Sequence, residues 1–147
     1  MSIPSLFEQL GGEARLRAII DRFVDRIFDD VMIGFFFRHT TRERVKAKEY
    51  EFAAVHLGAD VIYSGRPIRQ VHAPHPIMGG QFMRRMKILD EVLLEFEAPQ
   101  AVRTHWLAHT EALRDQVTRD AGGRCDPAAA LERTQRPSAA KDCENEA

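Results

Sequence analysis

One histidine stands where the chain could bind a metal. His72 shares the apolar side of a short predicted helix with Ile68 and Val71, at i, i+3, i+4 spacing. Pro67 suits the first position of this helix, and Pro74 ends it. Neutral imidazole is a good ligand for iron, so a ring held toward the interior could bind that metal. The position equally suits a half-buried histidine without a metal, and the local residues leave both interpretations open.

A second set of polar side chains lies on an otherwise apolar helix face. Thr40 or Thr41 can cap a helix that runs to about Leu57, and Gly58 ends it. A glutamate and a histidine interrupt the apolar stripe of this helix. Its predicted inward face consists of Val45, Glu49, Phe52, Ala53 and His56.

Other histidines carry weaker signals. His105 and His109 are four residues apart on a predicted helix and could bind a metal such as zinc, but no third ligand at matching spacing is visible. We therefore expect them in packing or on the surface. His75 follows Pro74 and is expected to face solvent. The sequence has no nucleophile motif, phosphate-binding loop or catalytically spaced pair of carboxylates, so it predicts no particular enzyme.

The elements that must position these residues are helices. Apolar residues recur at helical spacing over residues 13–28, and the run 35–37 (FFF) after Gly34 predicts a corner with at least one ring in the core. Two later helices are separated by Pro99. No segment alternates as a strand does, so the fold class is all-α. The inward residues of the two later helices are predicted to be Phe82, Met86, Leu89, Leu93 and Phe96, then Val102, Trp106, His109, Leu113 and Val117.

Composition limits the classes of protein. The chain has 147 residues, of which 44% are hydrophobic, which suits one soluble domain over residues 1–119. Residues 120–147 have few large apolar side chains and are expected to form a disordered tail. A net charge of -1 gives no reason to expect nucleic acid or a membrane as partner. The first residues lack a signal-peptide pattern, so we expect a cytoplasmic protein.

An ordered set of segments resembles a known family. Residues 6–12 (LFEQLGG), 21–28 (DRFVDRIF) and the aromatic corner resemble the truncated haemoglobins, in particular group I-like bacterial members. Residues 63–67 (YSGRP) followed by 70–72 (QVH) resemble the approach to that family's proximal histidine. The resemblance implies a two-over-two helical sandwich that holds haem b, with iron bound by His72.

The same resemblance implies roles for several pocket residues. Phe37 matches an aromatic residue that packs on the haem face, and Phe23 matches a phenylalanine of the pocket. Phe52 lies on the same predicted helix face as Val45 and Glu49. Lys48 matches a basic residue that can reach a haem propionate, although it also suits a solvated helix position. The weaker propionate candidates are Tyr63, Arg66 and Arg69.

The departures from the family lie in the distal pocket. Val24 stands where the family usually has a tyrosine, and Val45 and Glu49 occupy positions that often carry glutamine or another polar donor. Arg85 lies on the apolar side of its helix, where it could reach a propionate or pair with Glu49.

These residues imply a globin that reversibly binds a diatomic gas such as oxygen, nitric oxide or carbon monoxide. A redox role would require a partner reductase, because the chain has no flavin or nicotinamide domain. Two alternatives stay open: a haem-free helical interaction module, and an electron-transfer protein with bis-histidine iron in which His56 supplies the second ligand.

Overall fold

A computed structural model describes residues 2–120 of the chain, and within that range it contains helices and no strand. The all-α prediction is confirmed. The elements are α1 (Leu6–Leu10), α2 (Glu13–Asp29), the 3-10 helix η1 (Gly34–Phe37), α3 (Arg42–His56), α4 (Ile68–His72), α5 (Gly79–Glu95), α6 (Gln100–Ala112) and α7 (Arg114–Val117). The predicted tail lies outside the described residues, apart from Asp120, whose carboxylate accepts a hydrogen bond from the Gly79 amide.

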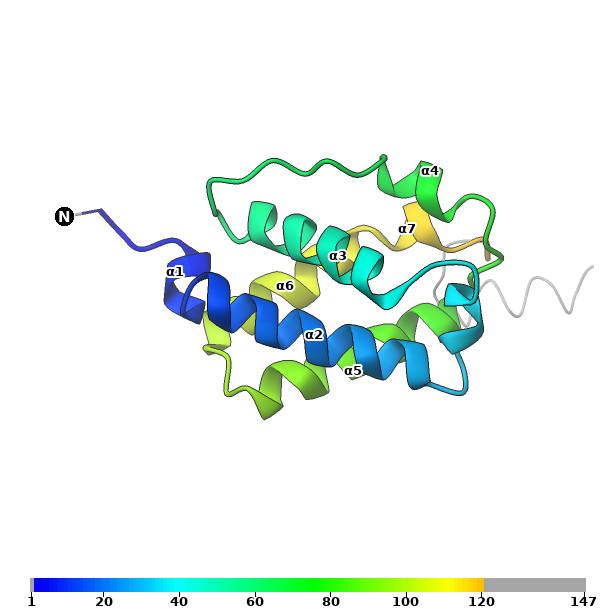
Figure 1. Ribbon diagram of the computed structural model, residues 1–147, viewed down its shortest axis with the longest axis horizontal. Helices are drawn as coiled ribbons and strands as arrows, with labels where there is room; N and C mark the ends of the chain where they lie inside the picture. Colours follow the sequence, from blue (N-terminus) through cyan, green and yellow to red (C-terminus); the bar gives the residue numbers. More distant parts are fainter. Residues whose placement is uncertain (1, 121–147) are drawn as a thin grey trace, which may run out of the picture.

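Two pairs of long helices form the body of the molecule. Figure 1 shows α2 beside α3, with α5 and α6 packed against them and the short α4 reached by a long connection from the end of α3. This is the two-over-two arrangement that the sequence predicts. None of the helices within residues 2–120 is both long and apolar enough to cross a membrane.

Helix α2 supplies the centre of the hydrophobic core. Its apolar residues recur at helical spacing, so one stripe can be buried along its whole length. The structure buries nearly all of this predicted stripe, and Phe28 at its end is half-buried against the core. The buried residues are Leu16, Ile19, Ile20, Phe23, Val24 and Ile27.

Helix α3 begins and ends as predicted but turns a different face inward. The Thr41 side chain accepts a hydrogen bond from the Arg44 amide, and Gly58 follows the helix with φ +93°, a left-handed conformation that favours glycine. The buried residues of α3 are Tyr50, Ala53 and Ala54. The small side chains of Ala53 and Ala54 let α3 approach α2 closely. Most of the predicted inward stripe then lies beside α6 and the connection to α4, where it is only half-buried.

The corner after α2 depends on one glycine. A side-chain carbon on Gly34 would lie 2.5 Å from the Phe28 carbonyl oxygen, so only glycine fits this close approach. The rings that follow are partly buried rather than fully inside: Phe35 is exposed, and Phe36 and Phe37 pack at the edge of the core.

The last predicted helix is interrupted. The chain forms α6, then a break at Leu113, then α7. The residues that are buried there include Thr110 and Arg114, whereas Leu113 and Val117 are half-buried. The predicted face is therefore wrong from Leu113 onward, because the break changes the direction in which the later residues point, whereas His109, which precedes the break, packs against α3.

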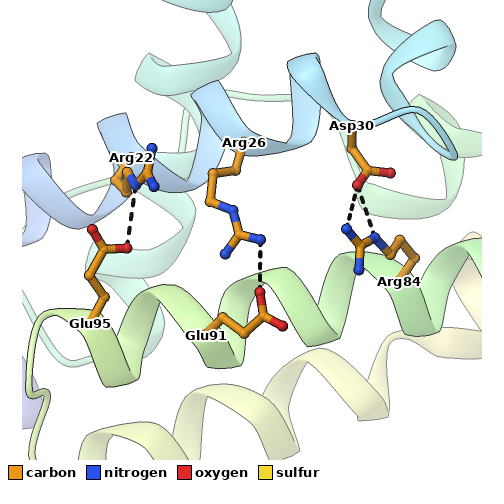
Figure 2. Close-up of polar contacts among 6 residues, drawn as sticks. All are labelled: Arg22, Arg26, Asp30, Arg84, Glu91 and Glu95. Carbon is orange, nitrogen blue, oxygen red and sulfur yellow. Dashed lines mark hydrogen bonds and ion pairs between the residues drawn. The ribbon is translucent and has the colours of Figure 1, made fainter.

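Three ion pairs join α2 to α5 along one edge of the core. Figure 2 shows Arg22 with Glu95, Arg26 with Glu91, and Asp30 with Arg84. The outermost pair is half exposed at both ends, whereas the Asp30 side chain is only 6% exposed. The Asp30 carboxylate accepts two hydrogen bonds from Arg84, at 2.7 and 2.9 Å, and others from the amides of Met32 and Ile33.

Replacing Asp30 with alanine should destabilise the fold strongly. The change removes the partner of a partly buried guanidinium and leaves two loop amides without their acceptor, which we expect to lower the free energy of unfolding by about 2–4 kcal/mol. The matched control is Glu95→Ala, which breaks an exposed pair and should cost less than about 1 kcal/mol. Urea denaturation of both variants measures the difference. Equal losses would show that burial of Asp30 adds nothing.

Candidate functional site

The side chain of His72 has one free nitrogen and one engaged nitrogen. Its Nδ1 lies 2.8 Å from the carbonyl oxygen of Ile68, one turn earlier in α4. Because a carbonyl only accepts, Nδ1 carries the proton and donates it, which leaves the lone pair on Nε2. Histidines that bind metals are commonly oriented by such a bond from the other ring nitrogen. The arrangement therefore suits a ligand that acts through Nε2.

Burial keeps the His72 ring neutral. It lowers the pKa of His72 below the ordinary value of 6.5, and the charge of Arg85 lowers it further. The hydrogen bond to Ile68 and the charge of Glu49 act in the opposite direction. A neutral imidazole is the form that binds metals, so the local environment favours the chemistry that the sequence predicts for this residue.

An ion pair joins two of the other predicted site residues, which lie on two different helices. Arg85 Nη2 of α5 lies 2.8 Å from Glu49 Oε1 of α3, so the structure has the pairing that was one of the two outcomes predicted for Arg85. The guanidinium also lies over the ring of Phe23 in α2, with its carbon 4.8 Å from the ring centre. Side chains from α2, α3 and α5 thus meet at Arg85.

Two of the other predicted site residues, Lys48 of α3 and Tyr63, bond to the connection between α3 and α4. Lys48 Nζ lies 2.7 Å from the hydroxyl oxygen of Ser64 in this connection, and that serine also bonds the Glu51 carboxylate. Tyr63 donates a hydrogen bond from its hydroxyl to the Arg66 carbonyl at 3.2 Å. Lys48 and Tyr63 therefore anchor this connection. Their proposed contact with a propionate stays a prediction.

The remaining predicted residues are spread around this region. Phe37 stacks on Phe28 with ring centres 4.8 Å apart. Phe52 meets the edge of Tyr63, with ring centres 5.4 Å apart. Val45 is half-buried, and the Arg69 side chain is exposed at the start of α4. The pocket roles of these residues stay predictions.

Three histidines pack together between α3 and α6, which the sequence did not reveal. The rings of His56 and His109 stack with centres 4.1 Å apart, and His105 lies 5.4 Å from His56. His105 Nε2 bonds the His56 carbonyl at 2.9 Å. The packing role expected for the α6 pair is confirmed. No group of three histidine, cysteine or acidic side chains within residues 2–120 is arranged to hold a metal ion.

The position of this cluster bears on two further predictions. His56 faces α6, where its ring also meets Phe52 and Trp106. That environment gives no support to His56 as a second iron ligand. The expectation that His75 faces solvent was wrong, because its ring is half-buried against the edge of Phe36, 6.3 Å between centres.

Comparison with known proteins identifies the class. The family model for bacterial-like globins matches residues 5–119, so the chain belongs to the bacterial-like globin family. The group 1 truncated haemoglobin GlbN of Mycolicibacterium paratuberculosis is 35% identical over 68 residues, which cover 46% of this chain and 50% of that relative. The chain spans about half the length of the first curated relatives that it matches.

Solved structures support the same fold. The haemoglobin of Chloroflexus aurantiacus is 26% identical and superposes with a TM-score of 0.71, over 80% of this chain and 99% of that one. The truncated haemoglobin of Tetrahymena pyriformis has a TM-score of 0.71 at 22% identity, over 78% and 98% of the two chains. Membership of this family identifies haem with its iron as the cofactor, and the free Nε2 of His72 fits that group.

The histidine cluster should make the fold sensitive to acid. Burial, with smaller effects from His109 and His105, lowers the pKa of His56 to about 3. Between pH 6.5 and 3 the unfolded chain binds a proton at this residue and the folded chain does not. The free energy of unfolding should therefore fall as pH falls, by up to about 1.4 kcal/mol per pH unit from His56 alone.

Chemical denaturation between pH 6.5 and 4 tests this expectation. His56→Leu should flatten the dependence of stability on pH, because the titrating ring is gone. The control is His39→Gln, which removes an exposed histidine. An unchanged slope in His56→Leu would contradict the assignment of acid sensitivity to the cluster.

Proposed function

We propose that this globin reversibly binds a diatomic gas at a haem iron held by His72. The observation that carries the proposal is the hydrogen bond from His72 Nδ1 to the Ile68 carbonyl, which leaves Nε2 free on a half-buried, neutral ring. Haem supplies an iron with a coordination position at which oxygen, nitric oxide or carbon monoxide can bind. The protein determines which ligand is held and for how long.

The residues around that position set its polarity. Val24 is fully buried and Val45 half-buried, and neither side chain has a hydrogen-bond donor. A ligand that gains partial negative charge on binding is retained by nearby donors, each typically worth about 0.5–1.5 kcal/mol. We infer that residues 24 and 45 retain oxygen less than a tyrosine at position 24 would. Carbon monoxide, which gains less charge, is affected less.

Two observations weigh on the alternatives. The packing of His56 against α6 supports a single histidine ligand rather than a bis-histidine iron. A haem-free module gives no role to a neutral histidine whose Nε2 is free. A redox role with a reductase and a cytoplasmic location are compatible with the proposal and need their own tests.

Replacement of His72 tests the iron ligand. His72→Gly should lose haem or hold it loosely, with a broadened Soret band, and added imidazole should restore the native ferrous spectrum by occupying the space left by the side chain. His75→Gly removes a histidine three residues later and serves as the control. Haem uptake with an unchanged spectrum in His72→Gly would exclude His72 as the ligand.

Replacement of Val45 tests the polarity of the pocket. Val45→Gln adds an amide donor to the pocket. The control, Val45→Met, has a side chain as long as glutamine but no donor. Oxygen should dissociate about tenfold more slowly from Val45→Gln than from Val45→Met, which corresponds to about 1.4 kcal/mol. Carbon monoxide dissociation should change much less. Stopped-flow measurement of both gases on both variants decides the point. Equal oxygen rates would place residue 45 outside the pocket.

A further inference from the structure

The pair formed by Glu49 and Arg85 is the charged part of the predicted pocket. Its two side chains are 26% and 27% exposed, so solvent screens their charges less than those of a surface pair. The Arg85 guanidinium also lies over the ring of Phe23, another residue predicted to line the pocket. The pair therefore lies among the side chains on which the proposed function depends.

Two contacts hold the guanidinium in one orientation. Nη2 is bound to Glu49, and the planar group lies over the buried ring of Phe23. A guanidinium has five N–H donors and keeps its charge at all physiological pH values. The contact with Glu49 engages only one of its three nitrogens. Arg85 therefore keeps donors for a further acceptor.

Three other residues near the predicted ligand position offer no free donor. Val24 and Val45 are apolar, and the Tyr63 hydroxyl already bonds the Arg66 carbonyl. We propose that Arg85 determines ligand specificity in this pocket: oriented by Glu49 and Phe23, it favours small anions, and ligands that gain negative charge, over neutral ligands of equal size. The inference rests on the proposed function, because it assumes that the ligand binds opposite His72.

Glu49 has two opposing effects in this arrangement. Its carboxylate orients Arg85, and its negative charge offsets part of the cation that the ligand meets. Glu49→Gln keeps an oxygen that can accept from Arg85 but removes the charge. This variant should therefore bind anions more tightly than the wild type, whereas loss of Arg85 should bind them less tightly. The two substitutions move affinity in opposite directions.

Azide binding to the ferric, haem-loaded protein provides the test. At neutral pH, a titration followed by the Soret shift should give a dissociation constant at least about tenfold higher for Arg85→Met, a change of about 1.4 kcal/mol. Arg85→Lys, which keeps the charge, should stay within about threefold of the wild type, and Glu49→Gln should bind more tightly. The matched control is Lys87→Met, which removes an exposed cation from the same helix. Imidazole, a neutral ligand, should bind all variants alike.

The infrared stretching frequency of carbon monoxide on the ferrous protein gives a second readout, which reports the local electric field. Arg85→Met should raise this frequency and Glu49→Gln should lower it. Unchanged azide affinity and frequency in Arg85→Met would overturn the specificity role while the gas-binding function stands. If Arg85→Met does not fold, equal azide affinities of Glu49→Gln and the wild type overturn the role instead. By contrast, failure of the wild type to retain haem, or native spectra from His72→Gly, would overturn the proposed function itself, and with it the role of Arg85.

Discussion

The buried stripe of α2 is the constraint on which the other elements depend. Its six core residues are at most 1% exposed, so every side of that stripe must be covered by another helix. Burying apolar surface is the largest favourable contribution to folding, at about 25 cal/mol per Å². Helix α3 covers one side with small residues, and α5 covers another with Ile88, Leu89, Val92 and Leu93. The ion pairs along α2 and α5 then hold the two helices in one register.

That packing determines the geometry of the candidate site. Phe23 belongs to the core stripe, yet its ring face supports the Arg85 guanidinium. Because α2 and α5 are held in register, Arg85 reaches across to Glu49 on α3. His72 contributes from a short helix on the far side of the long connection. The site is therefore assembled from four helices, and only the orientation of the His72 ring is decided within a single one.

The environments of the half-buried histidines and of the ion pairs have opposite effects on charge. The imidazoles of His56 and His72 stay neutral, because burial penalises their charged forms. Asp30 stays charged because the Arg84 guanidinium, within hydrogen-bond distance, lowers the pKa of its carboxyl group. Glu49 and Arg85 form a second such pair. The predicted site thus combines a neutral histidine with an ion pair.

The sequence by itself determined the features that depend on local chemistry. Helical spacing of apolar residues predicted α2, α3 and α5, and prolines and glycines predicted where α3 and α4 end, because these residues restrict or extend the allowed backbone angles. The helical position of His72 on the apolar side of a proline-bounded segment was visible for the same reason. Only the tertiary structure decided which of two partners Arg85 takes, which face of α3 is buried, and that His56 meets two histidines of α6. The Arg85 pairing and the His56 cluster depend on contacts between residues 36 to 53 positions apart, and the buried face of α3 depends on its packing against α2. Such contacts follow from how closely whole helices approach one another, which no local pattern records.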